Sequence, residues 1–157
     1  MGRAYRVERA RAEDAVSIAE LIAASKKDAM PWLTVVHTPE EDRSWVADVL
    51  LAEHEVRVVR DGGRLAAVLA TSPGWIDQLY VAPEAQGAGI GRALLAEARA
   101  ASDGELQLWA FQRNTRSRRF YEASGFVAVE FTDGTGNEER EPDVRYRWVR
   151  DGARADD

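Results

Sequence analysis

The chain of 157 residues contains no cysteine and only two histidines, His37 and His54. Without a thiol there can be no disulfide, no thiolate nucleophile and no cysteine-ligated metal, and two histidines are too few for a histidine-rich zinc site. We therefore expect no metal centre. The absence of cysteine is also compatible with a reducing compartment, and we expect a cytoplasmic protein.

Long apolar runs and positive charge are scarce as well. No stretch approaches the length of a membrane span, and residues 1–6 contain no apolar signal segment. The formal net charge is −6 at pH 7, whereas nucleic-acid binding selects for a basic face. One local basic cluster, Arg116, Arg118 and Arg119, is short and lies on a predicted helix. We expect neither a membrane nor a nucleic acid as a partner.

Hydrophobic residues make up 45% of the sequence, which is enough for an ordinary core. The length predicts one domain over residues 1–150, followed by a polar tail at 151–157. Apolar periodicity and turn residues predict strands at 5–10, 56–60, 65–70, 75–81, 106–110, 126–131 and 144–149. Helices are predicted at 12–25, 38–51, 89–101 and 114–124.

The order of these elements predicts an α+β fold with a mixed sheet. Strand 75–81, helix 89–101 and strand 106–110 form a β-α-β crossover, so the two strands should be parallel neighbours. Asp61-Gly62-Gly63 is a strong hairpin signal, and antiparallel hairpins should extend the sheet on either side of the crossover.

The most informative stretch is the glycine-rich turn before helix 89–101. Glycines at 87, 89 and 91 would let a phosphate approach the unpaired amides of the helix start, where the macrodipole adds positive potential. The P-loop pattern fails because Gly91 is followed by Arg92-Ala93, and the dinucleotide fingerprint fails because Arg92 occupies the place of its third glycine. The remaining pattern is Gln-x-x-Gly-x-Gly. By itself it is also compatible with a tight turn that binds nothing.

A second motif lies downstream of strand 106–110. Its matching positions are Asn114, Ser117, Phe120, Tyr121, Glu122, Gly125 and Phe126. Together the two motifs resemble the signatures of the GNAT acyltransferase superfamily, whose members use acetyl-CoA. The resemblance covers roughly residues 5–148 and is most specific over 79–126. It implies the GNAT fold, with a mostly antiparallel sheet of about seven strands, four helices, and parallel, splayed fourth and fifth strands.

The resemblance also implies a cofactor site. Backbone amides of Leu79, Tyr80 and Val81 would hold the acetyl oxygen and the pantetheine arm. The pyrophosphate would lie on the amides of Gln86, Gly87, Ala88, Gly89, Ile90, Gly91 and Arg92. Asn114, Ser117 and Phe120 would contact the arm, and the phenol of Tyr121 would donate a proton to the departing CoA sulfur.

Several of these residues have structural alternatives that the sequence leaves open. Asn114 is a good helix cap, and Gly125 suits the left-handed residue that ends a helix. Phe120 and Phe126 fit a core, and Tyr121 could be one more buried aromatic residue.

The general base is less well defined by the sequence. Trp109 stands at the strand position where peptide amino-terminal acetylating relatives carry a glutamate. Asp77 on strand 75–81 is the first candidate, acting through water. Its alternative is a solvated carboxylate at a sheet edge. An amine that arrives already neutral would need no dedicated base, although free alkylamines resemble lysine, with a pKa of about 10.4.

For the acceptor amine, we expect a pocket apolar on one side and acidic on the other. Its residues would be Trp32, Leu33, His37, Glu138 and Glu139. The apolar loop 26–37 could instead cover the core, and the charged run 137–143 could simply be solvated. A small-molecule amine is the preferred acceptor, attacking acetyl-CoA directly in a ternary complex. Protein or peptide amines, a non-catalytic acyl-CoA-binding module, and a homodimer through strand 144–149 remain alternatives or additions.

Overall fold

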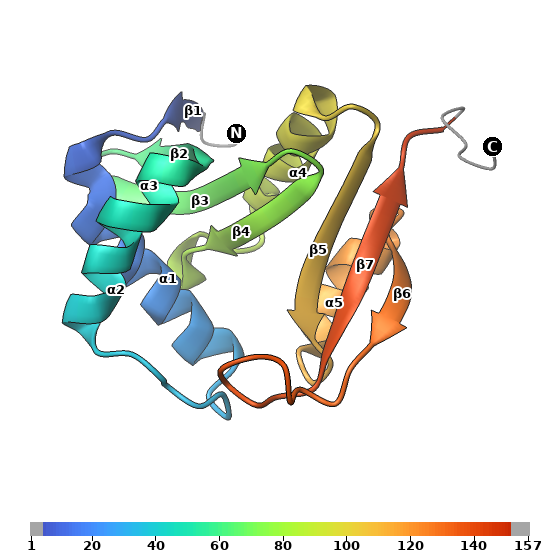
Figure 1. Cartoon of the computed structure of the whole chain (residues 1–157). Coiled ribbons are helices and arrows are strands. Elements are labelled where there is room, and N and C mark those ends of the chain that lie inside the picture. Colours follow the sequence, from blue (N-terminus) through green and yellow to red (C-terminus); the bar gives the residue numbers. More distant parts are fainter. Residues whose placement is uncertain (1–4, 152–157) are drawn as a thin grey trace.

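The computed structural model describes residues 5–151, so the predicted tail lies almost wholly outside the described residues. Seven strands in this part of the chain form one sheet in the order β1–β2–β3–β4–β5–β7–β6 (Figure 1). They are β1 (Arg6–Arg9), β2 (Glu55–Asp61), β3 (Arg64–Ser72), β4 (Trp75–Val81), β5 (Glu105–Phe111), β6 (Val127–Phe131) and β7 (Asp143–Val149).

The helices within residues 5–151 match the four predicted ones, because the elements from 39 to 53 form one continuous helical segment. The α-helices are α1 (Ala15–Ala29), α2 (Pro39–Trp45), α3 (Leu51–Glu53), α4 (Ile90–Ala101) and α5 (Thr115–Ala123). The π-helical turn η2 (Val46–Leu50) joins α2 to α3 without a break, and the 3-10 turns are η1 (Ala12–Asp14) and η3 (Pro83–Ala85).

The predicted end of the first helix is wrong. Residues 26–29, expected to be loop, continue α1 to Ala29. Lys26 and Lys27 in the last turn favour a helix C-terminus, because cations there interact well with the macrodipole. The helix ends at Met30 because a residue before proline, here Pro31, avoids the α region.

Strands β4 and β5 are parallel neighbours that diverge after one residue pair. Trp75 faces Gln107, whose amide donates to the Gly74 carbonyl at 2.9 Å, and no further pair follows. A bulge in β4 leaves Asp77 unpaired with β3. Figure 1 shows the resulting gap, which separates a first half of the sheet (β1–β4) from a second half (β5, β7 and β6).

Each half of the sheet has its own helical cover. In Figure 1, α1 and α2 lie on one face of the first half and α4 on the other, while α5 covers one face of the second half. Ile18 of α1, Val68 of β3 and Leu94 of α4 are completely buried between these layers. Tyr146 of β7 is equally buried on the α5 side of the sheet.

Strand 144–149 has no free edge to offer a second copy, and the homodimer stays a prediction. β7 is an interior strand that pairs with β5 on one side and β6 on the other. Its residues Val144 and Tyr146 have no exposed surface, because they form the core beneath α5.

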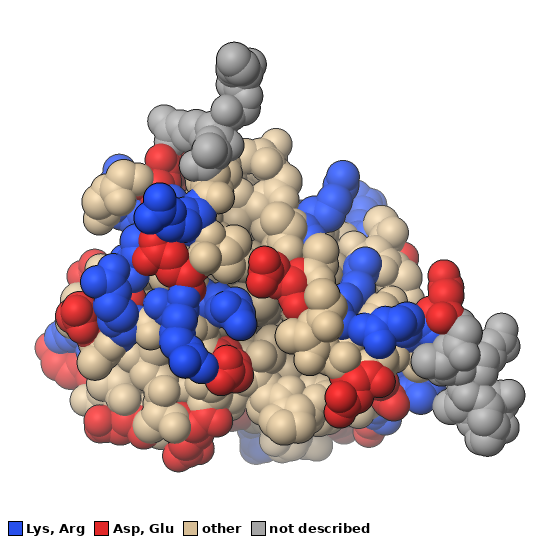
Figure 2. All heavy atoms as spheres, turned by 90° about the horizontal axis from the view of Figure 1, so that it is seen from above, with Lys and Arg blue, Asp and Glu red and all other residues tan. Residues whose placement is uncertain are grey.

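The protein surface mixes charges of both signs. Figure 2 shows Lys and Arg interspersed with Asp and Glu over the face seen from above. Opposite charges also pair beneath the surface, where Arg60 contacts Glu8 at 2.9 Å and Asp14 at 2.8 Å. Within residues 5–151, no helix combines the length and the apolar character needed to cross a bilayer.

Candidate active site

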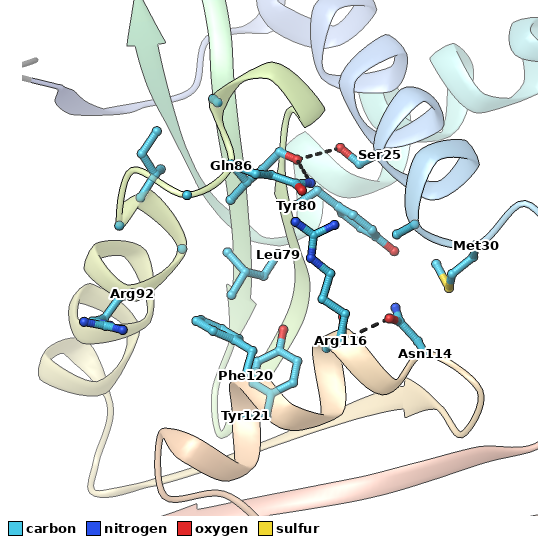
Figure 3. A pocket seen from close by; sticks show the side chains of 18 residues that line it. Ser25, Met30, Leu79, Tyr80, Gln86, Arg92, Asn114, Arg116, Phe120 and Tyr121 are labelled. Atoms are coloured by element: carbon cyan, nitrogen blue, oxygen red, sulfur yellow. Dashed lines mark hydrogen bonds between the residues drawn. The ribbon is translucent and has the colours of Figure 1, made fainter.

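A cavity of about 270 Å³ lies where β4 and β5 diverge (Figure 3). Its walls come from the end of α1, from β4, from the glycine turn before α4 and from α5. The lining residues are Ser25, Ala29, Met30, Leu79, Tyr80, Val81, Ala85, Gln86, Gly87, Gly89, Ile90, Gly91, Arg92, Asn114, Arg116, Ser117, Phe120 and Tyr121. All the predicted cofactor residues are therefore brought together except Ala88, which is exposed beside the cavity.

The glycine turn presents unpaired amides to this cavity. Gly87 and Gly89 have φ values of 87° and 81°, a left-handed conformation that side chains with a Cβ adopt only at a cost. Gly89 caps α4, and the first amide to donate back to the turn is that of Ala93, to the Gly89 carbonyl at 3.0 Å. Within the described chain, the amides of 90–92 have no backbone acceptor, as expected for a helix N-terminus.

The turn is held in place by the carbonyl of Val81. This oxygen accepts hydrogen bonds from the Gln86 side chain at 3.2 Å and from the Ser25 hydroxyl at 3.0 Å (Figure 3). The glutamine of the motif thus fastens the turn to β4, and the buried Ser25 fastens both to α1. Sequence reasoning missed Ser25 because a serine inside an amphipathic helix carries no signal for such a contact.

Tyr121 is the buried phenol of the site. Only 9% of the residue is exposed, and its ring packs edge-on against Phe120 and Phe126 at centroid distances of 5.1 and 5.6 Å. Its hydroxyl points toward the Leu79 side of the cavity and makes no hydrogen bond within residues 5–151 (Figure 3). Burial raises the pKa of the Tyr121 phenol, with a smaller contribution from Tyr80, so the group stays protonated and can donate.

The helix α5 begins at a capping asparagine. The Asn114 side-chain oxygen accepts from the Ser117 amide at 3.2 Å, which confirms the expected capping role while the residue also lines the cavity. Arg92 and Arg116 are exposed on α4 and α5, line the cavity, and have no ion-pair partner within the described chain. Arg116 was noticed only as part of a basic cluster, since its direction depends on how α5 packs.

A second cavity, of about 420 Å³, lies between the two halves of the molecule on the side of α1 and α2. Its lining is mostly apolar on α1 and acidic on α2 and on loop 132–142. The lining residues are Ala19, Ile22, Ala23, Lys26, His37, Glu41, Asp42, Trp45, Val46, Gln78, Glu138 and Glu139. Neighbouring residues line the two cavities, because Ser25 and Leu79 line the first while Lys26 and Gln78 line the second.

Sequence and structure comparisons identify the family. The family model described as an acetyltransferase (GNAT) domain matches residues 43–128, more than half of the chain. This protein belongs to the GNAT acetyltransferase superfamily. No curated protein sequence matches it.

Solved structures show the same fold along almost the whole GNAT chain. The solution structure of apo YjaB from Escherichia coli has a TM-score of 0.75 at 19% identity, covering 94% of this chain and 99% of that one. The structure of yncA from Salmonella typhimurium with its cofactor acetyl-CoA has a TM-score of 0.69 at 17% identity, covering 99% of both chains. PaiA N-acetyltransferase from Thermoplasma acidophilum, in complex with coenzyme A, has a TM-score of 0.70 at 21% identity and covers 94% of this chain and 99% of that chain.

The predicted acceptor residues of this GNAT domain separate into two groups. His37, Glu138 and Glu139 line the second cavity, and His37 Nε2 lies 2.8 Å from a carboxylate oxygen of Glu138. Trp32 and Leu33 do not line it. The loop 30–38 covers the core only through the buried Met30, because Val35 is 86% exposed.

Asp77 is placed apart from Tyr121 in this GNAT domain. Its carboxylate accepts a hydrogen bond from the Ser72 hydroxyl at 2.7 Å and lies 3.8 Å from His54 Nε2. It lines neither of the two cavities, because the β4 bulge places it next to the β3–β4 turn. The next residue, Gln78, lines the second cavity instead.

The His37–Glu138 contact should make the stability of the folded state depend on pH. The hydrogen bond and the charge of Glu138 raise the pKa of His37 above its ordinary 6.5. A raised pKa means that the pair stabilises the folded state fully below pH 6.5 and that this contribution is lost as the pH rises through the pKa of His37.

Titration of His37 by NMR measures this effect. We expect Glu138→Gln to lower the pKa of His37 toward 6.5, whereas Glu40→Gln, which removes an exposed carboxylate that contacts Arg43, should not. An unchanged His37 titration in the Glu138 variant would show that the contact is absent in solution.

Proposed function

We propose that the protein is an N-acetyltransferase that moves the acetyl group of acetyl-CoA to a primary amine of a small molecule, by direct attack in a ternary complex. One observation carries the proposal. The unpaired amides of the glycine turn and the free, protonated hydroxyl of Tyr121 open into the same cavity. That combination suits a thioester cofactor with an anionic tail, and the second cavity is lined by the neighbouring residues Lys26 and Gln78.

Each step of the proposed acetyl transfer has a group in the site that can assist it. The neutral amine nitrogen attacks the acetyl carbon, and the carbonyl oxygen becomes an oxyanion that needs donors. Beyond Trp75 the edge of β4 facing β5 has no strand partner, so backbone amides around residues 79–81 are available to the oxyanion and to the pantetheine arm. When the carbon–sulfur bond breaks, the sulfur takes the proton of the Tyr121 hydroxyl, the nitrogen gives up one proton to a base or to water, and the Tyr121 phenolate regains a proton from solvent.

Charge in the second cavity supports a cationic acceptor. Four carboxylates line it, those of Glu41, Asp42, Glu138 and Glu139, against the cation of Lys26 and that of His37 when it is protonated. A surplus of negative charge raises the local concentration of protonated amines. The apolar α1 side of the cavity suits a carbon chain next to the amine.

The decisive experiment is release of CoA thiol from acetyl-CoA over a panel of amines. The panel contains polyamines, amino acids, aminoglycosides and short peptides at mildly alkaline pH. Release that depends on one class of small amine supports the proposal and names the acceptor class. Release on peptides alone would make the protein a peptide acetyltransferase, and saturable acetyl-CoA binding without any release would make it a binding module.

Asp77 remains a proposed base that acts through water. The pH–rate profile of an Asp77 variant tests this role. If Asp77 accepts the amine proton, Asp77→Asn should remove the limb of the profile on which activity rises with pH. Glu139→Gln is the matched comparison, because Glu139 lines the second cavity directly. An unaltered profile in Asp77→Asn would end its candidacy, and a loss confined to Glu139→Gln would transfer the role to that carboxylate.

A further inference from the structure

Loops must hold the wide end of the gap between β4 and β5 together, because strand pairing does not. The two strands share one residue pair and then separate. Within residues 5–151, three polar or aromatic contacts join loop 30–38 of the first half to the second half. They are Trp32 with Arg113, Trp32 with Phe111, and His37 with Glu138. Figure 1 shows loops 30–38 and 132–142 meeting below the gap.

Arg113 makes the densest set of these contacts. Its guanidinium carbon lies 4.1 Å from the centroid of the Trp32 ring, a cation–π distance. The same guanidinium donates two hydrogen bonds to the carboxylate of Glu141, at 2.8 and 3.0 Å. We call these three residues the Trp32–Arg113–Glu141 clasp. It connects the loop after α1, the turn after β5 and the loop between β6 and β7.

In the second half, hydrogen bonds that do not involve Trp32 hold the segment next to Arg113 in place. The amide of Gln112 donates to the Pro142 carbonyl at 2.9 Å, and its side chain donates to the Thr132 and Asp143 carbonyls at 2.9 and 3.0 Å. The Glu141 side chain is only 14% exposed, so its carboxylate depends on Arg113 for a partner. The contact with Glu141 thus holds the Arg113 guanidinium where Trp32 of loop 30–38 packs against it.

We propose that Arg113 is a positioning residue for the acceptor amine. The two loops that it joins are the ones that carry His37, Glu138 and Glu139 into the second cavity. By holding Trp32 on one loop and Glu141 on the other, Arg113 sets the distance between the two walls of the acceptor cavity. The role rests on the proposed function of that cavity. Arg113 itself lines neither the first cavity, which we call the cofactor cavity, nor the second, which we call the acceptor cavity.

Steady-state kinetics of Arg113→Ala test this role. We expect the KM for the amine to rise about tenfold, the change that roughly 1.4 kcal/mol produces, while the KM for acetyl-CoA stays within about twofold. Arg113→Lys should recover only part of the loss, because lysine keeps the charge but not the planar fork that stacks and binds bidentately. Arg119→Ala is the control, since Arg119 is an exposed arginine of α5 without a hydrogen bond or ion pair within the described chain.

Hydrogen exchange gives a readout that does not depend on turnover. In Arg113→Ala, amides of loops 30–38 and 132–142 should exchange faster together, while α4 keeps the exchange rates of the parent protein. Unchanged exchange in loop 30–38, or an acetyl-CoA KM that rises as much as the amine KM, would overturn the proposal. If no amine supports turnover, the proposed function fails, and coupled exchange of the two loops alone decides whether Arg113 joins them.

Discussion

Replacing Tyr121 by phenylalanine should lower kcat by about 100-fold, the lower end of the contribution expected from a positioned acid. The ring remains to pack against Phe120 and Phe126, so only the hydroxyl is lost. That hydroxyl has no hydrogen bond within the described residues, so its removal leaves no buried partner unsatisfied. Stability and acetyl-CoA affinity should therefore change little, and the loss should fall on turnover.

The measurement combines turnover with acetyl-CoA binding by calorimetry. Tyr146→Phe provides the control, because Tyr146 is a buried phenol of the same core whose hydroxyl contacts Glu122 and Arg118 rather than the cavity. That variant should lose stability rather than turnover. If Tyr121→Phe turns over as fast as the parent protein, Tyr121 is not the acid.

Replacing Gly134 by alanine should disable the acceptor side of the protein. Gly134 has a φ of 87°, and a Cβ at this position would lie 2.4 Å from the carbonyl carbon of Glu141. The left-handed conformation alone costs a residue with a Cβ roughly 1–2 kcal/mol, and the overlap with backbone cannot be relieved by a side-chain rotation. Loop 132–142 must therefore rearrange and move Glu138 and Glu139 out of the acceptor cavity.

We expect kcat/KM for the amine to fall about tenfold or more in Gly134→Ala, the factor that roughly 1.4 kcal/mol corresponds to. Acetyl-CoA binding should be unchanged, because no residue of this loop lines the cofactor cavity. Gly136→Ala is a matched control in the same loop, since a Cβ at Gly136 meets nothing within 4 Å. Equal kinetics in the two variants would mean that the conformation of this loop does not matter for the acceptor.

Local sequence signals predicted the elements because each depends on near neighbours in the chain. Thr38 and Glu41 form a reciprocal cap at the start of α2, where a helix was predicted to begin. Gly125 has the left-handed φ of 95° expected where α5 ends. The predicted end of α1 was too early because residues 26–29 are polar or small and carry no apolar period, although they are good helix formers.

The residues of the glycine turn and of α5 that line the first cavity could also be predicted, because they lie on two continuous motifs. The glycine turn and the start of α5 each carry their own signal, and the crossover between them requires β4 and β5 to be neighbours. Residues contributed by a distant helix gave no signal. Ser25, Ala29 and Met30 line the cavity only because the end of α1 packs beside β4.

The acceptor side shows where sequence reasoning stops. His37 and Glu138 were named from two separate loops, but nothing in either loop says that they touch. Trp32 looked like a pocket wall, and its ring is instead covered by the guanidinium of Arg113. Asp77 looked like a base beside the cofactor, and the β4 bulge places it near Ser72.

The sequence alone determined the order of elements, the parallel pairing of β4 with β5, the glycine turn before α4, and Tyr121 on α5. Those features follow from propensities, caps and chain connectivity, which act over a few residues or one crossover. Only the tertiary structure decided which loops meet across the gap and which charges share a cavity. Contacts such as Trp32 with Arg113 join residues far apart in the chain, and packing of the two halves of the sheet brings them together.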